Sequence, residues 1–258
     1  MKKARIAAIA ALAALALRIP AQAARPQPRY VAMTFDDGPS AKTVRLLEGL
    51  AKRRAHATFF VCGYRVEQFP ETLVQICERG HELGMHGYSH RYFTELSPAE
   101  LEQELTALAL QITEITGHAP TLIRPPGGLS STEVLRDSPC ADYPVILWGV
   151  DTMDWNTKDA KSVCRKITKS ARCGSVILMH DTSDSSVDAA LSAIDCLQAQ
   201  GYVFLTVSEL AAQMGYDLLG GHVYFRFPPK MLESAQPLRA DCPAQNPAVR
   251  RRVRKAVR

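Results

Sequence analysis

Beyond residue 29, short segments rich in β-branched and aromatic residues alternate with longer segments whose apolar residues recur every three or four positions. The short segments predict β-strands, and the longer ones predict amphipathic helices. Seven strands are expected, at Tyr30–Phe35, Ala57–Val61, Glu82–Met85, Thr121–Arg124, Pro144–Trp148, Ser175–Met179 and Tyr202–Leu205. The expected helices cover residues 41–54, 66–79, 98–116, 131–137, 158–171, 185–199 and 207–214.

Seven strand–helix repeats predict parallel strands joined by right-handed crossovers, which is an α/β fold. The length of the repeating region favours a small or incomplete (β/α) barrel, and a doubly wound open sheet is the alternative. We expect a single catalytic domain over residues 30–215, preceded by a linker over 24–29. From Tyr216 the pattern changes. One more strand could form at 223–227, and prolines interrupt the residues after it, so 216–258 is interpreted as an extension that ends in a basic tail.

The N-terminus carries a different pattern. Twelve apolar residues, 6–17, follow Lys2, Lys3 and Arg5 and precede the small residues around Ala23. This predicts a secretory signal peptide over residues 1–23, with an uncleaved anchor as the alternative. Either interpretation places the protein outside the cytoplasm, secreted or associated with the cell wall. The apolar run is shorter than the roughly 20 residues of a membrane-spanning helix, so no stable membrane span is expected.

The net charge of +5 comes from the two ends of the chain. Residues 1–23 hold four basic residues and residues 250–258 hold six, with no acidic residue in either segment, so residues 24–249 carry a net charge of −5. A mildly acidic folded part argues against nucleic acid as a partner.

The seven cysteines show neither a CxxC pair nor the Cys/His spacing of a structural zinc site.

Polar residues with catalytic potential follow the expected strand ends. Parallel strands of an α/β fold bring their carboxyl ends together at the functional face, so these side chains are expected to meet there. They come from five strands, and they are Asp36 and Asp37, then His86 and His90, then Arg124, then Asp151 and Asp154, and finally His180 and Asp181.

Such a set suits hydrolysis assisted by a metal ion. His86 and His90 together with one carboxylate make a ligand set that leaves a coordination position open for water, as catalytic sites do. A second carboxylate can act as general base, oriented by Arg124. His180 can protonate a leaving group, and a carboxylate such as Asp154 can hold its tautomer. The chain has no Gly-x-Ser-x-Gly turn and no phosphate-binding glycine loop, so metal-assisted hydrolysis of an acyl bond is the favoured chemistry.

Five short motifs in this order resemble those of the polysaccharide deacetylase family, which is carbohydrate esterase family 4 with the NodB homology domain. They are Thr34-Phe35-Asp36-Asp37-Gly38-Pro39-Ser40, His86-Gly87-Tyr88-Ser89-His90, Arg124-Pro125-Pro126-Gly127-Gly128, Asp151-Thr152-Met153-Asp154-Trp155 and Leu178-Met179-His180. The resemblance implies a distorted (β/α)7-type barrel and hydrolytic removal of acetyl groups from a carbohydrate.

The resemblance also implies a role for individual residues. Asp36 falls at the general base, Arg124 at the residue that tethers it, and Asp154 and His180 at the carboxylate–histidine pair whose histidine is the general acid. The implied metal ligands are Asp37, His86 and His90, and the metal is zinc (Zn²⁺) or another divalent ion such as cobalt, nickel or manganese. The residues implied to contact substrate are Gly127, through its oxyanion-binding N–H, and Trp155 and Leu178, which line the acetyl pocket.

Two positions depart from the family pattern. Gly87 stands where relatives usually carry a serine or threonine hydroxyl, which removes a hydrogen bond that helps orient a ligand. Gly127 stands where many relatives carry an aromatic residue, although its N–H is retained. We expect a deacetylase for an N-acetylated polysaccharide, with peptidoglycan ahead of chitin. An O-acetyl xylan esterase and a non-catalytic carbohydrate-binding relative are the alternatives.

Overall fold

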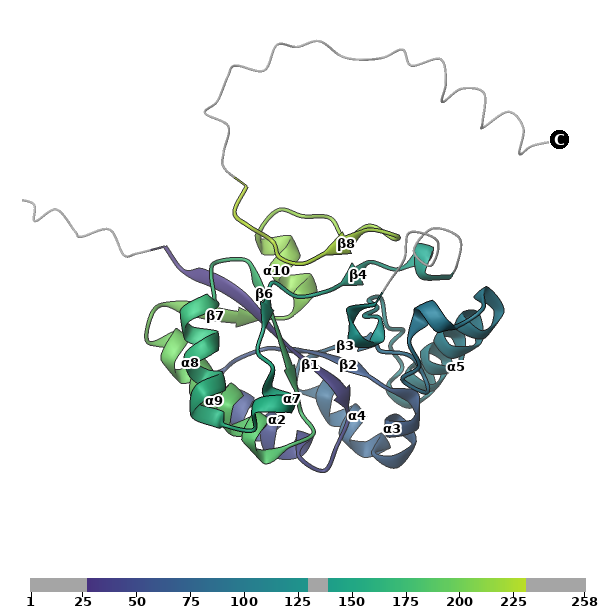
Figure 1. The fold of residues 1–258 in the computed structure, drawn as a ribbon, viewed down its shortest axis with the longest axis horizontal. Coiled ribbons are helices and arrows are strands. Elements are labelled where there is room, and N and C mark those ends of the chain that lie inside the picture. The colour runs from purple at the N-terminus through teal and green to yellow at the C-terminus, as the bar shows by residue number, and fades with distance from the viewer. Residues whose placement is uncertain (1–26, 130–138, 231–258) are drawn as a thin grey trace, which may run out of the picture. The chain divides into compact units, whose positions relative to one another are not determined.

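A computed structural model describes residues 27–129 and 139–230 (Figure 1). The predicted signal peptide, the helix expected over 131–137 and the basic tail lie outside the described residues. The strands are β1 (Arg29–Gly38), β2 (Thr58–Val61), β3 (Glu82–Met85), β4 (Val145–Ile146), β5 (Val150–Asp151), β6 (Ser175–His180), β7 (Tyr202–Leu205) and β8 (Val223–Tyr224). The α-helices are α2 (Thr43–Arg53), α3 (Gly63–Gln68), α4 (Pro70–Glu78), α5 (Pro98–Thr116), α7 (Asp154–Thr157), α8 (Ala160–Ser170), α9 (Asp184–Gln198) and α10 (Val207–Gln213).

The main sheet is parallel, as the strand–helix alternation predicts. Its strands run in the order β3-β2-β1-β6-β5, and β7 pairs with the beginning of β1. Single bridges from Met85 to Ile123 and from Ile123 to Val145 continue the sheet toward β4, which pairs with β8. An antiparallel bridge between Ser175 and Arg226 then brings the chain back to the start of β6. The result is the distorted barrel that the motifs imply.

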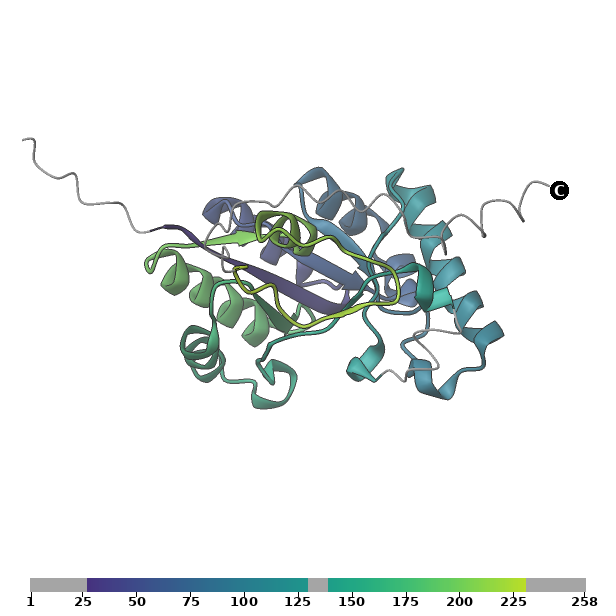
Figure 2. The same ribbon diagram turned by 90° about the horizontal axis from the view of Figure 1, so that it is seen from above.

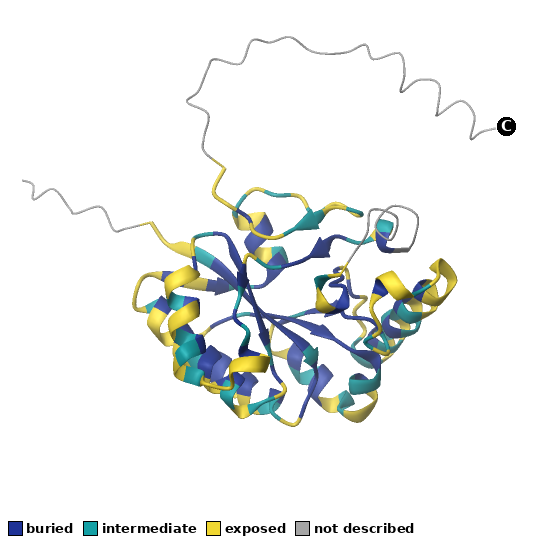
Figure 3. Cartoon of the chain, in the orientation of Figure 1, coloured by how far each residue is buried: buried dark blue, intermediate teal, exposed yellow. Residues whose placement is uncertain are grey.

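Alternation along β1 shows how the barrel is filled. Val31, Met33 and Phe35 pack into the large core shared with the outer helices. Ala32 points the other way, into a smaller apolar cluster with Val176 and Phe227 at the amino end of the strands. Figure 3 shows the strands buried, while the helices around them expose their outer faces. The central strands β1, β2 and β6 therefore bury both faces, which is typical of parallel sheets covered by helices.

Three elements differ from the sequence prediction. The strand expected at 121–124 is reduced to the bridges of Ile123, because Pro120, Pro125 and Pro126 cannot donate backbone hydrogen bonds to a sheet. The helix expected over 66–79 is two helices, α3 and α4, divided at Phe69 before Pro70. The strand expected over 144–148 shrinks to β4, and the short β5 follows it after a break at Gly149.

The segment after α10 packs onto the same body. Phe227 is fully buried, and its N–H donates to the carbonyl of Gly174 (2.7 Å). Tyr224 stacks on the Phe227 ring, and Tyr216 meets that ring in a T-shaped contact. In the view from above, this segment crosses over the strands (Figure 2). No described helix is long and apolar enough to cross a membrane.

Candidate active site

The polar residues of the motifs lie at the carboxyl ends of the strands, around a pocket of about 420 Å³. β1 contributes the two adjacent aspartates, the loop after β3 contributes the two histidines, and β6 contributes His180 at its last position. Eight of the ten residues predicted from the sequence as site residues line this pocket, and Arg124 and Asp154 are buried directly behind it. The eight are Asp36, Asp37, His86, His90, Gly127, Trp155, Leu178 and His180.

Asp36 is held by a buried arginine. The Arg124 guanidinium is fully buried and donates to Asp36 Oδ1 (2.6 Å) and to Thr34 Oγ1 (2.8 Å). Its other nitrogens donate to the carbonyls of Ile146 (2.8 Å) and Leu147 (3.2 Å). These four hydrogen bonds compensate the buried cation, which would be costly without partners. Asp36 is therefore fixed with one oxygen on Arg124 and the other directed toward the histidines.

Arg124 is also covered by aromatic rings. Its guanidinium carbon lies 4.0 Å from the ring centre of Phe60 and 5.7 Å from that of Trp148. Burial lowers the pKa of Arg124, and the carboxylate of Asp36 opposes that change. An arginine keeps its charge under such conditions, so a cation lies against the Asp36 carboxyl group inside the barrel.

Asp37, His86 and His90 bring three potential metal-ligand atoms within 4.8 Å of one another. Asp37 Oδ1 lies 3.3 Å from His86 Nε2 and 3.1 Å from His90 Nε2. That oxygen is buried, and no described residue gives it a hydrogen bond of acceptable geometry. Asp37 Oδ1 is thus a buried acceptor without a hydrogen bond, close to two imidazole nitrogens. A divalent cation bound between these three atoms would satisfy it.

The electrostatics agree with that donor set. Burial raises the pKa of Asp37, but the imidazoles of His86 and His90 outweigh it and hold the pKa well below its usual range. The carboxylate is therefore ionised and ready to bind a cation. Two imidazoles and one carboxylate suit zinc, cobalt, nickel and other transition metals, and they do not select among them. The three residues thus form a site that fits a divalent metal.

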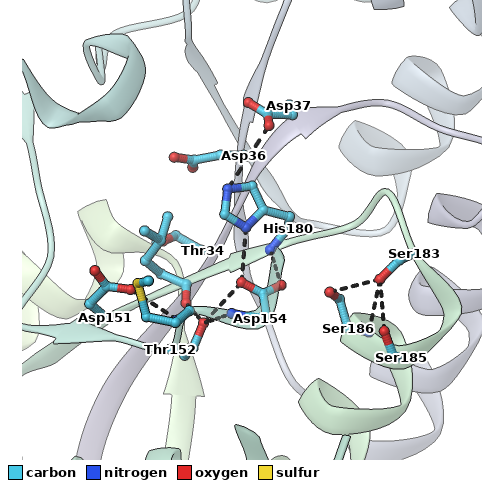
Figure 4. Close-up of polar contacts among 12 residues, drawn as sticks. Thr34, Asp36, Asp37, Asp151, Thr152, Asp154, His180, Ser183, Ser185 and Ser186 are labelled. Atoms are coloured by element: carbon cyan, nitrogen blue, oxygen red, sulfur yellow. Dashed lines mark hydrogen bonds and ion pairs between the residues drawn. The ribbon is translucent and has the colours of Figure 1, made fainter. Parts of the chain in front are cut away.

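On the opposite side of the pocket, His180 is held by Asp154 (Figure 4). Asp154 Oδ1 lies 2.9 Å from His180 Nδ1, and Oδ2 accepts from the His180 backbone N–H (2.9 Å). Burial raises the pKa of Asp154, and hydrogen bonds from His180 and Ser186 reverse this and lower it overall. Burial lowers the pKa of His180, but Asp154 and the two aspartates of β1 raise it to about 9. His180 Nε2 faces Asp37 Oδ2 at 3.9 Å.

The residues expected to contact substrate line the same pocket. Gly127 lies in a short 3₁₀ turn with φ +62°, and no described residue accepts a hydrogen bond from its N–H. Leu178 is nearly buried on the floor, whereas Trp155 is 57% exposed at the mouth. These positions suit the roles that the resemblance implies, and the roles themselves stay predictions.

Three residues that line the pocket, Tyr92, Trp148 and Met153, are not predicted from the sequence, whereas Asp151, which also lines it, is expected at this face. Thr152, likewise not predicted, donates from Oγ1 to Leu178 O (2.7 Å) and to Asp154 Oδ1 (3.0 Å). Thr152 and Met153 lie inside a motif, next to residues that the sequence does select, and that position is a signal for both. Tyr92 carries no sequence signal, because only the turn of the loop after His90 brings it over Gly127.

Fold and site together define an α/β barrel with an Asp-His-His metal site, a buried arginine–aspartate pair and a histidine–aspartate pair around one pocket. A model of the family described as polysaccharide deacetylase matches residues 23–146. A peptidoglycan-N-acetylmuramic acid deacetylase, PdaC of Bacillus subtilis, is 41% identical over 186 residues, which are 72% of this chain and 39% of that protein. A peptidoglycan-N-acetylglucosamine deacetylase of Bacillus cereus is 36% identical over 188 residues, 70% of this chain and 88% of that protein.

A solved structure with the same fold is a family 4 acetyl xylan esterase from Clostridium thermocellum in complex with a cobalt ion. The TM-score is 0.73 at 28% identity, and the match covers 78% of this chain and all of that one. The chain belongs to the polysaccharide deacetylase family, carbohydrate esterase family 4. It spans about two fifths of the length of PdaC.

Proposed function

We propose that this protein is an exported, metal-dependent hydrolase that removes acetyl groups from N-acetylglucosamine-type residues of a polysaccharide, peptidoglycan or a chitin-like polymer. The observation that carries the proposal is the position of Asp36, between the Asp37–His86–His90 group and the arginine that holds it. Binding relatives need no buried base beside a metal site, so the complete set favours catalysis. Export rests on the predicted signal peptide over residues 1–23, and the catalytic domain is proposed to cover residues 30–215.

The roles of the residues follow from their positions. Asp37, His86 and His90 would hold the ion, which supplies Lewis-acid chemistry by polarising an acyl carbonyl and acidifying water. Asp36 takes the proton of the attacking water through its oxygen that is not bound to Arg124. Arg124 keeps that carboxylate aimed into the pocket through a charge-assisted hydrogen bond (2.6 Å).

The other groups act on the substrate. The N–H of Gly127 donates to the oxyanion that develops on the former carbonyl oxygen. His180, held by Asp154, delivers a proton from Nε2 to the leaving nitrogen, which departs as the free amine. Leu178 and Trp155 contact the acetyl methyl group and exclude water from it. The immediate products are acetate and a glucosamine-type residue.

Acetate release tests the proposal directly. The purified protein, loaded in turn with Zn²⁺ and Co²⁺, is incubated with peptidoglycan, chitin oligomers and acetylated xylan. Asp36→Asn is the matched control, because it keeps the size of the side chain and an oxygen that can accept from Arg124. We expect acetate from an N-acetylated polymer and a loss of at least ~10²-fold in the variant, since general base catalysis contributes that much. Unchanged acetate release by Asp36→Asn would contradict the assignment.

Hydrolysis of an O-acetyl ester is the second candidate function. The structural similarity to an acetyl xylan esterase favours it, because both reactions use the same attack and differ in the leaving group. Acetate from acetylated xylan with none from peptidoglycan or chitin oligomers would replace the first proposal with this one. Tight glycan binding without acetate release from any polymer, by protein shown to hold metal, would favour a non-catalytic binding role.

A further inference from the structure

The two histidines of the metal site are held in different ways. His86 directly follows β3, and its Nδ1 lies 2.7 Å from the carbonyl of Arg124, which fixes the ring. His90 Nδ1 has no hydrogen-bond partner among the described residues, and its side chain is 37% exposed. The direction of the His90 ring therefore depends on the backbone that carries it.

That backbone has an uncommon conformation. His90 has φ +63° and Gly87 has φ +83°, so the loop turns through the left-handed region twice within four residues. A non-glycine residue at positive φ is strained and persists only when its surroundings hold it. The first N–H groups of α3 hold the early part of the loop, where Gly63 donates to the Gly87 carbonyl (3.3 Å) and Tyr64 to the Tyr88 carbonyl (3.1 Å).

Beyond Tyr88 a single carboxylate, that of Glu104, holds the backbone of the loop in the part of the chain that the structure describes. Glu104 Oε2 accepts from the backbone N–H of Ser89 (2.8 Å), and Oε1 accepts from its hydroxyl (2.6 Å). Among residues 27–129 and 139–230, no other hydrogen bond reaches the backbone of Ser89, His90 or Arg91. The same carboxylate lies against Gly87, where a Cβ would stand 3.5 Å from Glu104 Oε2.

Glu104 is itself on a well-anchored support. Helix α5 begins with a capping box between Ser97 and Glu100, and its Leu101, Leu105 and Leu108 are buried in the core. Glu104 lies within about one turn of all three leucines, so its position on the helix is fixed even though its carboxylate reaches the surface. A rigid helix can therefore transmit its position to the loop through two hydrogen bonds.

We propose that Glu104 is a positioning residue for the metal site. By accepting both hydrogen bonds from Ser89, it holds the loop in the conformation that places His90 Nε2 beside Asp37 Oδ1. Gly87 has no hydroxyl group that could orient a metal ligand. Glu104, on helix α5, supplies that orientation for His90 in its place. Partners of this kind, which touch a ligand's support and not the metal, typically change metal affinity about 10–100-fold. The proposal rests on the proposed function only in that the site binds a divalent ion.

Metal affinity measured without substrate tests it. The full chain is stripped of metal with a chelator and titrated with Co²⁺, whose visible absorption reports its ligand set. We expect Glu104→Ala to raise the Kd about tenfold and to alter the absorption band. Ser89→Ala loses only the hydroxyl bond, and Glu104→Gln keeps an acceptor for the Ser89 N–H, so both are expected to raise the Kd by less.

Glu102→Ala is the matched control, because Glu102 is an exposed glutamate of the same helix and forms no described hydrogen bond or ion pair with the loop. We expect it to bind Co²⁺ like the unmodified protein. A Kd for Glu104→Ala within twofold of that of Glu102→Ala would overturn the proposal. If Glu104→Ala does not fold, as judged by its melting curve, Ser89→Ala and Glu104→Gln decide, and wild-type affinity in both overturns it. Normal Co²⁺ binding without acetate release would instead count against the proposed function alone.

Discussion

His86 and His90 are four residues apart, yet the protein positions them by opposite means. His86 is buried directly after β3, and its ring is fixed by a backbone carbonyl. His90 lies on a partly exposed loop, and among the described residues the one hydrogen bond to the backbone of residues 89–91 runs from the Ser89 N–H to a glutamate of α5. The core of the barrel therefore fixes His86, whereas a side chain of the outer helix α5 holds the loop that carries His90. A metal site of this kind can keep its core ligand unchanged while the loop ligand responds to substitutions on α5.

Replacing His86 and His90 one at a time should show that the two histidines are held differently. The loss of Co²⁺ affinity in these variants is the largest effect we expect. His86→Ala and His90→Ala should both weaken Co²⁺ binding by more than the roughly 10–100-fold typical of an outer partner, because each removes a ligand. Only His86→Ala should also lower the free energy of unfolding, by about 1–3 kcal/mol, since it leaves the Arg124 carbonyl buried without its donor. Chemical denaturation of the metal-free variants measures this difference. Equal destabilisation by the two substitutions would contradict the comparison.

Substitution of Gly87, at the beginning of the loop, tests whether the backbone conformation there positions His90. Gly87→Ala places a Cβ 3.2 Å from Phe93 Cε1 and forces a side chain into φ +83°. We expect a loss of about 1–2 kcal/mol in the free energy of unfolding from the backbone conformation alone. Because Gly87 shares a loop with His90, Co²⁺ affinity should fall as well. Retained affinity with lowered stability would show that His90 does not depend on the loop conformation.

Adding metal should protect the two ligand regions unequally. Hydrogen exchange of the backbone amides is measured with and without saturating Co²⁺. The His86 N–H already donates to the Val61 carbonyl (2.9 Å) inside the sheet, so its exchange should slow little beyond the global stabilisation. The amides of residues 89–91 are expected to open locally, because one hydrogen bond from Ser89 to Glu104 holds them among the described residues. They should gain more protection when the ion binds His90. Uniform protection across both segments would indicate that the loop is already as rigid as the strand.

The smallest effect is expected next to His90 itself. Arg91 forms an exposed ion pair with Glu100 (3.1 Å), and both side chains are about half exposed. Such pairs contribute little in water, so Arg91→Ala should change the Co²⁺ Kd by less than about twofold. The same Co²⁺ titration measures it. A larger change would mean that the charge near His90, and not the hydrogen bonds of Ser89, controls the ligand.

Much of the fold could be predicted from the sequence because local patterns encode it. Strands such as β1 and β6 have continuous apolar runs, and α5 starts at a Ser97-Pro98 cap and ends at Gly117. Prediction was weakest between 121 and 151. There the sheet depends on single bridges at Ile123 and on two short strands, β4, which pairs with distant β8, and β5, which pairs with β6, so local propensity carries little information.

The candidate site shows a similar division. The polar residues at the strand ends were predicted as one group because parallel strands bring their carboxyl ends together. All of them except Asp181, which is buried against Thr43, line or back one pocket. Tyr92 and Glu104 were not predicted. Neither stands in a motif, and each reaches the site only because a loop or a neighbouring helix folds against it.

By itself, the sequence determined the order of strands and helices, the family and the chemistry available at the strand ends. These depend on residue types and short spacings, which the chain carries locally. Only the tertiary structure decided that one oxygen of Asp36 belongs to Arg124, that Asp37 Oδ1 is buried between two imidazoles, and that Glu104 holds the loop of His90. Those relations join residues up to 88 positions apart, because packing of the helices around the barrel sets the distances between side chains and no local pattern records them.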